Sequence, residues 1–250
     1  MTGKLYGVGV GPGNPAQMTL QAREILQKVD VICPATSRPD KRSLALKIAA
    51  RAADLNAEID KLIFPMTDDE TKMRKAWQQA GDRVRKHLNN KRDVAFITLG
   101  DPLLYSTYIY LLEELQGQKQ KFAIETIPGV SAITGCSSCI NLPLARGEEK
   151  VAVVPVPGEQ EKNNLAGEIS EILQIFDTLV LLKVSRNFSR IKTILDQLGL
   201  KQKAVLISRY GQKQEEVITD IDELESEEID YLASLVINKN SSLQPQKGVD

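Results

Sequence analysis

The sequence is poor in the side chains that most often carry metal-dependent and general-base chemistry. Among its 250 residues there is a single histidine, His87. Without a second histidine, an H-E-x-x-H zinc motif is excluded, and a Ser-His-Asp set would have no choice of partner. The three cysteines, Cys33, Cys136 and Cys139, are too few and odd in number for a disulfide framework. They fit a reducing compartment, so we expect a cytoplasmic protein with no bound metal.

The charge balance and the apolar runs argue against two further classes of partner. The 32 basic and 33 acidic side chains give a net charge of -1, without the basic excess typical of proteins that bind nucleic acid. No apolar run approaches the roughly 20 residues of a membrane-spanning helix. The first residues also lack the basic-then-apolar pattern of a secretory leader. We therefore expect neither nucleic acid nor a membrane as partner.

Short apolar runs alternate with stretches of helical periodicity along the chain. Strands are expected at residues 4–9, 30–33, 59–64, 93–99, 122–127, 150–156, 178–184, 203–210 and 215–219, with 231–238 closing the pattern. Helices are expected at 19–29, 42–57, 71–88, 107–115, 131–139 and 188–199, and the acidic run 220–228 as a solvated helix. This alternation predicts an α/β protein with helices on the faces of a parallel sheet.

A polar, glycine-containing stretch at residues 116–121 interrupts this pattern. We therefore expect two α/β domains, one over residues 1–117 and one over residues 118–240. The polar residues 241–250 form a tail in this interpretation.

The first motif that bears on function is the run G-V-G-V-G-P-G-N-P at residues 7–15, directly after the first strand. Glycines allow positive φ and let a ligand approach the backbone. The spacing is not that of a dinucleotide-binding fingerprint, because Asn14 stands where the third glycine is required. The G-K-[ST] of a Walker loop is absent as well. Taken alone, the run fits a ligand-binding loop and a rigid turn about equally well.

Two more turns follow strands. T-L-G-D-P, at residues 98–102, contains Asp101, which is able either to accept hydrogen bonds from a ligand or to form an Asx turn with its own backbone. I-P-G-V-S-A, at residues 127–132, joins a strand to a helix with Ser131 as a natural N-cap. Each turn alone also fits a plain strand-to-helix connection.

In this order and spacing, the three motifs resemble those of the tetrapyrrole (corrin/porphyrin) methylases. These are S-adenosylmethionine-dependent C-methyltransferases of cobalamin and sirohaem synthesis, and the resemblance spans nearly the whole chain. G-D-P-L-L-Y-S-T-Y at residues 100–108 and L-P-L-A-R-G-E-E at residues 142–149 are most similar to the branch that methylates carbon 20 of precorrin-2 or cobalt-factor II. One departure is Asn14, where the family usually has Asp.

The resemblance implies two α/β domains of the tetrapyrrole methylase type, with the active site in the interdomain cleft, and a homodimer. It also implies S-adenosylmethionine as methyl donor. Carried over by motif, the cofactor-binding residues are Pro12, Gly100, Asp101, Leu104, Ser131, Ala132, Lys183 and Gly211. Lys183 stands where the family often has an apolar residue, and a buried lysine there would need a partner. Asp101 is also the one candidate for a catalytic role in proton removal.

The substrate class that the resemblance implies, a tetrapyrrole, carries many carboxylates, which arginine forks bind well. Arg38, Arg42 and Arg146 lie in expected loops and are candidates for binding substrate, with ordinary surface charge as the alternative. Tyr105 is a candidate for contacting the macrocycle, whereas Tyr108 is expected in the core.

The remaining residues with chemical potential are assigned to structure. His87 is expected to face solvent on a charged helix rather than to bind cobalt. The C-x-x-C spacing of Cys136 and Cys139 has no second pair, so buried packing is favoured over zinc or redox chemistry.

Other functions stay open at this point. Within the family these are a methylase acting at a different ring carbon, a uroporphyrinogen III methylase, and a methylase of the diphthine synthase type with a protein substrate. A module that holds S-adenosylmethionine without catalysis is a further alternative. An NAD-dependent oxidoreductase is disfavoured by the glycine spacing and by V-I-C-P at residues 31–34, which offers no acidic residue at the end of the second strand.

Overall fold

The computed structural model of the chain describes residues 2–117, 121–156, 164–224 and 229–241. The chain forms two compact units, residues 1–131 and residues 132–250. This division lies later than the expected boundary at residue 117, because strand β6 (Ala123–Ile127) pairs with β1 (Lys4–Gly9) inside the first unit. The polar stretch at 116–121, of which 118–120 lie outside the described residues, therefore connects two elements of one unit.

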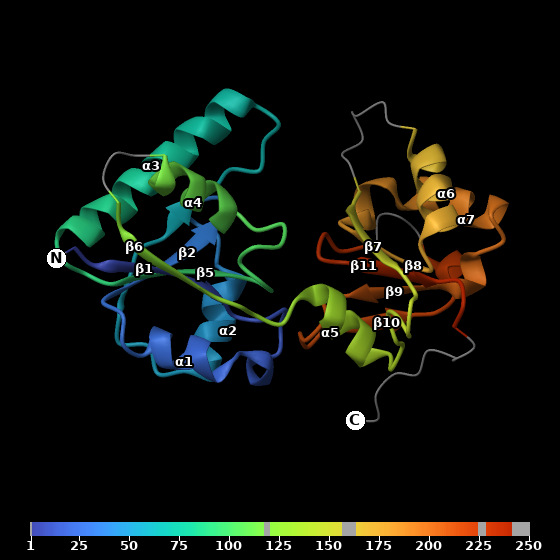
Figure 1. Cartoon of the computed structure of the whole chain (residues 1–250), viewed down its shortest axis with the longest axis horizontal. Helices are drawn as coiled ribbons and strands as arrows, with labels where there is room; N and C mark the ends of the chain where they lie inside the picture. Colours follow the sequence, from blue (N-terminus) through green and yellow to red (C-terminus); the bar gives the residue numbers. More distant parts are fainter. Residues whose placement is uncertain (1, 118–120, 157–163, 225–228, 242–250) are drawn as a thin grey trace. The chain divides into compact units, whose positions relative to one another are not determined.

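The first unit contains a parallel sheet (Figure 1). Its strands follow the order β3-β2-β5-β1-β6, and β4 also pairs with β2. Besides β1 and β6, the strands are β2 (Val31–Thr36), β3 (Glu58–Ile59), β4 (Leu62–Ile63) and β5 (Val94–Thr98). All of these pairs are parallel, as the alternation of strands and helices predicted. The carboxyl ends of the strands consequently lie at one edge of the sheet.

Helices cover both faces of this sheet. They are α1 (Leu20–Leu26), α2 (Leu44–Ala52), α3 (Glu70–Asn89) and α4 (Tyr108–Gln116). Alternate residues of β2 enter different cores: Cys33 packs with side chains of α3 and α4, and Ile32 packs with side chains of α1 and α2. The predicted N-cap of α1 is confirmed, since Thr19 Oγ1 accepts the N–H of Ala22 at 3.1 Å.

The second unit contains a mixed sheet with the strand order β10-β9-β11-β8-β7. Its strands are β7 (Val151–Pro155), β8 (Thr178–Leu182), β9 (Ala204–Ser208), β10 (Glu216–Ile218) and β11 (Ser234–Asn238). Strands β7 and β8 pair in parallel, whereas β11 pairs antiparallel with both β8 and β9, and β10 pairs antiparallel with β9. The helices are α5 (Ala132–Cys139), α6 (Leu165–Ile175) and α7 (Phe188–Gln197). One core lies between the sheet and α6 and α7, and another lies under α5.

Two segments of the second unit differ from the sequence prediction. Helix α6 was not predicted, although Leu165, Ile169 and Leu173 pack one of its faces into the core. The acidic run 220–228 is not a solvated helix in its described part. It forms only the 3₁₀ turn η4 (Ile221–Glu223), because Ile221 is buried in the core; residues 225–228 lie outside the described residues.

His87 does not face solvent, contrary to expectation. Its side chain is 14% exposed and lies between Asp60 and Arg92. Because arginine only donates, Nδ1 of His87 accepts from Arg92 Nη1 at 3.4 Å. Nε2 therefore carries the hydrogen and donates to Asp60 Oδ2 at 2.9 Å. The bond from Nε2 to Asp60 holds α3 against the segment between β3 and β4, and the bond from Nδ1 connects α3 to Arg92 in the loop before β5.

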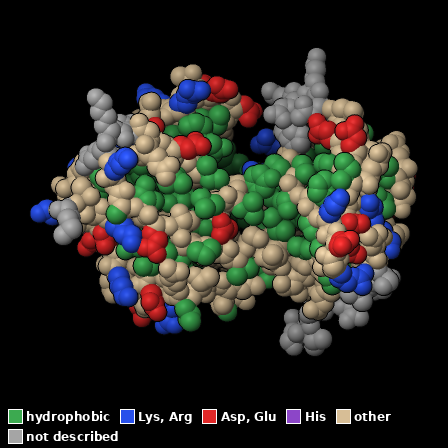
Figure 2. Space-filling model, viewed as in Figure 1, with side chains coloured by type: hydrophobic (Ala, Val, Ile, Leu, Met, Phe, Trp, Pro, Cys, Tyr) green, Lys and Arg blue, Asp and Glu red, His purple; other side chains and the backbone are tan. Residues whose placement is uncertain are grey.

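The surface has no single dominant sign of charge on the face drawn in Figure 2, where Lys and Arg side chains are interspersed with Asp and Glu. Within the described ranges, no helix combines the length and the apolar character that crossing a membrane requires. The same part of the chain contains no group of three or more His, Cys, Asp or Glu side chains that could hold a metal ion.

Candidate functional site

The candidate site of the first unit lies at the carboxyl edge of its parallel sheet. Strand β1 lies between β5 and β6. The three motifs follow these three strands as loops at residues 10–14, 99–107 and 128–131. Ligands of open α/β sheets bind at this edge. The structure therefore brings together the three motifs that the sequence analysis singled out.

The backbones of these loops touch one another without side chains between them. A Cβ atom built on Gly9 would lie 2.5 Å from the Gly100 carbonyl oxygen and 2.8 Å from Gly129 Cα. A Cβ atom on Gly129 would lie 2.2 Å from the same oxygen. In addition, the Gly100 N–H donates to the Gly11 carbonyl oxygen at 2.9 Å. Only glycine fits at Gly9 and Gly129, so the sequence here provides a cradle made of backbone.

Asp101 ties two of the loops together. Its Oδ1 accepts the N–H of Leu103 at 2.9 Å, which is the Asx turn that the sequence offered as an alternative. Its Oδ2 accepts the N–H of Gly129 at 3.1 Å. A carboxylate has about four acceptor sites, so each oxygen keeps a lone pair for a ligand. Asp101 is half-buried. Its carboxylate orders the two loops and still has acceptor sites for a ligand.

The segment after Asp101 exposes a run of large apolar side chains. Leu103, Leu104 and Tyr105 are 54%, 41% and 47% exposed. Tyr105 has a left-handed backbone with φ of 52°, which is uncommon for a residue with a large side chain. Tyr108, by contrast, is fully buried, as expected. A strained backbone beside an exposed apolar run is typical of a ligand-binding loop.

The other motif residues of the first unit lie around this cradle. Pro12 is buried in the loop after β1. Asn14 Oδ1 accepts the N–H of Ala16 at 3.0 Å, so the departure from Asp preserves an Asx turn. Ser131 ends the first unit and is half-buried, and Ala132 begins α5.

In the second unit, Lys183 and Gly211 lie at one edge of the mixed sheet. Strands β8 and β9 each pair antiparallel with β11, so they run in the same direction and end at the same edge. Lys183 follows β8 with φ of 59°, and Gly211 follows β9 with φ of 73°. Lys183 is half-buried and not fully buried, so it is not the fully buried lysine that would need a partner.

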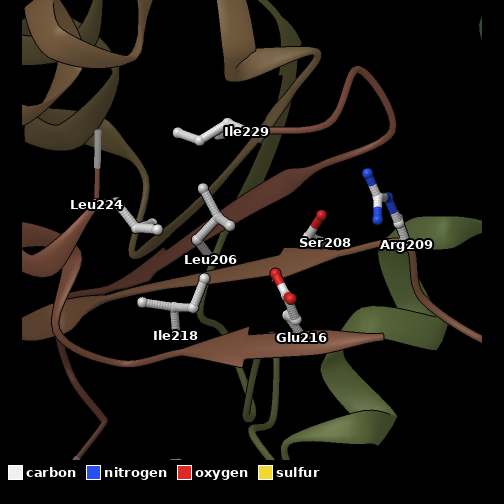
Figure 3. Close-up of a pocket in the computed structure, with 7 residues that line it drawn as sticks. All are labelled: Leu206, Ser208, Arg209, Glu216, Ile218, Leu224 and Ile229. Carbon is white, nitrogen blue, oxygen red and sulfur yellow. The ribbon is translucent and has the colours of Figure 1, made fainter. Parts of the chain in front are cut away.

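A cavity of about 330 Å³ lies beside the end of β9, on the face of the sheet that packs with α6 and α7. Figure 3 shows Ser208, Arg209 and Glu216 at one end of it, and at the other end a group of apolar side chains, Leu206, Ile218, Leu224 and Ile229. Arg209 Nε donates to Asp230 Oδ2 at 3.0 Å. This ion pair anchors the first residue of the turn that carries Gly211.

The structure divides the three candidate arginines between the units. Arg38 and Arg42 follow β2, which pairs in parallel with β5, so both lie at the same sheet edge as the loop at residues 99–107. The Arg38 side chain is 70% exposed and forms a long ion pair of 4.0 Å with Asp40. Arg42 and Arg146 are exposed as well. Arg38 and Arg42 therefore lie at the edge of the candidate site, and Arg146 lies in the second unit.

None of the three cysteines forms a disulfide. Cys33 and Cys136 are buried in hydrophobic cores, as favoured from the sequence. Burial raises the pKa of both thiols, that of Cys136 to about 12. Cys139 is half-buried, and its thiol donates to Glu215 Oε1 at 3.1 Å.

We expect iodoacetamide at pH 8 to alkylate Cys139 first in the folded protein. The thiolate is the reactive form, and the raised pKa values of Cys33 and Cys136 leave almost none of it at that pH. Peptide mass spectrometry before and after unfolding in urea measures the three sites separately. Equal labelling of all three cysteines without urea would contradict this expectation.

Three residues were not predicted from the sequence to have a role in the site: Gly9, Gly129 and Glu215. Gly9 and Gly129 belong to the motifs, but only the close approach of the three loops shows why they are glycine. Glu215, which binds both Cys139 and the N–H of Gly211, has no local signal. Its partner Cys139 lies 76 positions earlier in the chain.

Comparison with known proteins agrees with the expected family. The family model of the Tetrapyrrole (Corrin/Porphyrin) Methylases matches residues 4–225. The "Probable cobalt-precorrin-2 C(20)-methyltransferase" of Methanocaldococcus jannaschii is 32% identical, over 94% of this chain and 96% of that protein. The cobalt-precorrin-2 C(20)-methyltransferase of Salmonella typhimurium is 30% identical, over 96% and 98%. The precorrin-2 C(20)-methyltransferase of a Sinorhizobium species is 30% identical, over 94% and 95%.

A solved structure shares the fold. The uroporphyrin-III C-methyl transferase of Thermus thermophilus, complexed with S-adenyl homocysteine, matches with a TM-score of 0.66 at 19% identity. The match covers 95% of this chain and 98% of that one. The predicted fold class, two α/β halves of this type, is therefore confirmed.

Proposed function

Because this chain belongs to the tetrapyrrole (corrin/porphyrin) methylases, we propose that it transfers a methyl group from S-adenosylmethionine to carbon 20 of precorrin-2 or of its cobalt-containing form. Three relatives whose names state this reaction support the proposal. The observation that carries it is the close backbone contact between Gly9, Gly100 and Gly129, where a Cβ atom on Gly9 or Gly129 would clash with the Gly100 carbonyl oxygen.

The residues present fit S-adenosylmethionine. Its methionine and ribose end would be held by residues of the three loops and the start of α5, namely Pro12, Gly100, Asp101, Leu104, Ser131 and Ala132. The free lone pairs of Asp101 suit an ammonium group or ribose hydroxyls. The family resemblance assigns Lys183 and Gly211 to the cofactor as well, with Gly211 beside the adenine.

When bound, S-adenosylmethionine supplies an activated methyl group on its sulfonium to an electron-rich ring carbon. The protein has mainly to align donor and acceptor at about 3–3.5 Å. Loops whose backbones touch, and which Asp101 ties together, hold a ligand rigidly enough for this task. Two N–H donors already engage the Asp101 carboxylate, which supports binding and ordering as its role over proton removal.

The sheet edge near Arg38 and Arg42 suits a substrate with both carboxylates and a flat apolar body. Two exposed guanidinium groups lie at the same edge as the exposed side chains of Leu104 and Tyr105. Arginine binds carboxylates with paired hydrogen bonds, and aromatic or branched side chains cover a macrocycle. We therefore place tetrapyrrole binding at this edge, with Arg146 as a further candidate.

Arg38→Ala and Arg42→Ala are each expected to raise the KM for the tetrapyrrole by about tenfold, the value of one charge-assisted hydrogen bond. The affinity for S-adenosylmethionine stays unchanged, because neither residue belongs to the cofactor site. Arg51→Ala, an exposed arginine in the last turn of α2, is the matched control. Wild-type kinetics in the Arg38, Arg42 and Arg146 variants would leave these side chains as ordinary surface charge.

A methyl-transfer assay tests the proposed function directly. The protein is incubated with S-adenosylmethionine and, in parallel, precorrin-2, cobalt-factor II and uroporphyrinogen III, and each product is analysed by mass spectrometry. One added methyl group, mapped to carbon 20 of a precorrin-2-type ring, is the expected result. Methylation of uroporphyrinogen III instead would contradict the substrate. Transfer to none of these rings, with cofactor still bound, would favour a protein substrate or a non-catalytic module.

We also propose that the protein works as a homodimer in the cytoplasm, as the family resemblance implies. Three cysteines that form no disulfide suit a reducing compartment. Light scattering should give twice the chain mass of 27.7 kDa. A single-chain mass at micromolar concentration would contradict the dimer.

A further inference from the structure

The carboxylate of Glu215 connects the Gly211 turn to helix α5. Glu215 Oε2 accepts the N–H of Gly211 at 2.7 Å, and Oε1 accepts the thiol hydrogen of Cys139 at 3.1 Å. Glu215 lies just before β10 and is half-buried. One side chain therefore fixes both a backbone N–H at the end of β9 and the last residue of α5.

A second contact presses the same turn against the same helix. A Cβ atom on Gly135 of α5 would lie 2.3 Å from Cε1 of Tyr210, the residue before Gly211. The aromatic ring thus fills the space that a side chain at Gly135 would need. Because the helix presents Gly135 and Cys139 one turn apart, its small side chains accept the β9–β10 turn as a close neighbour.

The turn contains one residue with an unfavourable backbone conformation. Arg209, a non-glycine residue, has φ of 51°, whereas Gly211 adopts its φ of 73° without steric cost. A left-handed non-glycine residue such as Arg209 persists only where surrounding contacts hold it. Here the contacts are the ion pair of Arg209 with Asp230, the packing of Tyr210 on Gly135, and the Glu215 hydrogen bond to Gly211.

We propose that Glu215 is a positioning residue: it holds the Gly211 turn on α5 in the conformation that receives the cofactor. The inference rests on the proposed function, which assigns Gly211 to the cofactor site. Glu215 acts through Gly211 and does not itself touch the cofactor. A carboxylate accepts from both the N–H and the thiol, whereas glutamine has one acceptor oxygen and presents an amide donor to the other partner.

The test uses Glu215→Gln, Cys139→Ala and the double variant in the full-length protein. Glu216→Gln, the same chemical change one residue further along, is the control. Two readouts are independent of catalysis. Hydrogen exchange of the Gly211 amide in the free protein reports the turn, and calorimetry with S-adenosylhomocysteine reports the site. The unfolding temperature of each variant shows that it is folded.

We expect Glu215→Gln to speed Gly211 exchange and to raise the Kd for S-adenosylhomocysteine, each by about tenfold, as for the loss of one charge-assisted hydrogen bond. In the Cys139→Ala background the effect should shrink to about threefold or less, because the amide of Gln no longer faces the thiol donor and its oxygen can serve Gly211. Glu216→Gln should leave both readouts within about twofold of wild type.

Two results would overturn the inference while the proposed function stands. One is wild-type exchange at Gly211 in Glu215→Gln, and the other is faster exchange with an unchanged Kd, which would make Glu215 a merely structural residue. If wild-type protein itself does not bind S-adenosylhomocysteine, the proposed function fails first. The positioning role then falls with it.

Discussion

Gly129→Ala is expected to abolish measurable cofactor binding, with a loss of affinity of at least about a hundredfold. The new Cβ would lie 2.2 Å from the Gly100 carbonyl oxygen and 2.9 Å from Gly9 Cα. Both contacts are to backbone, so no side-chain rotation relieves them. The loops must move apart, and overpacking of this kind costs roughly 1–3 kcal/mol of stability. Calorimetry with S-adenosylhomocysteine and thermal unfolding measure the two effects.

Gly117→Ala is the matched control for this substitution. Gly117 is exposed at the end of α4, with φ of −67°, and a Cβ there would lie 3.2 Å from the Glu113 carbonyl oxygen. Alanine is favourable at such a helical position, so stability and affinity should stay close to those of wild type. If Gly129→Ala binds the cofactor as well as Gly117→Ala does, the backbone cradle is not the cofactor site.

The strands of the first unit could be predicted because both faces of its sheet are covered. Val94, Ala95, Phe96 and Ile97 of β5 are all buried, and an apolar run of this kind is visible without any structure. The pairing of the strands, by contrast, could not be predicted from local sequence. The polar stretch at 116–121 has the composition of a linker, yet the next strand returns to β1. Such a pairing depends on contacts far apart in the sequence, which local composition does not report.

Helix α6 shows that a usable signal can still be overlooked. Leu165, Ile169 and Leu173 recur every fourth residue, which is helical spacing, and Asn164 caps the start by accepting the N–H of Gly167 at 3.2 Å. The mixed direction of the second sheet has no comparable signal. The contacts of Glu215 with Gly211 and Cys139 have no such signal either, because Cys139 lies on a helix far away in the sequence and the contact leaves no spacing pattern.

The three motifs could be located from the sequence, but the contacts of individual residues such as Asp101 and His87 could be assigned only from the structure. Asp101 had two interpretations, a ligand-binding carboxylate and an Asx turn. The structure contains the Asx turn and adds a bond to Gly129 that neither interpretation included. His87 was expected in solvent because its neighbours are charged. It is enclosed because Asp60 and Arg92 supply a matching acceptor and donor.

Asp101→Ala is expected to weaken cofactor binding at least tenfold, about 1.4 kcal/mol. The substitution removes the acceptor for the N–H groups of Leu103 and Gly129, and it also removes the lone pairs proposed for the ligand. Asp101→Asn separates these effects. Its single acceptor oxygen can serve only one of the two N–H groups, so one loop connection is lost and the other kept, and an intermediate loss of affinity follows.

Asp54→Asn, an exposed carboxylate in the same unit, is the control for the change in charge. Calorimetry with S-adenosylhomocysteine compares the three variants with wild type, and hydrogen exchange of the Gly129 amide reports the loop contact in the free protein. If the exchange rises in Asp101→Ala but the affinity does not change, Asp101 orders the loops without contributing to the site. If affinity falls while Gly129 stays protected, the ligand contact dominates. We expect that Asp101→Ala lowers both the affinity for S-adenosylhomocysteine and the protection of the Gly129 amide. The reason is that the carboxylate oxygen that binds the Gly129 N–H lies at the edge where the three loops meet.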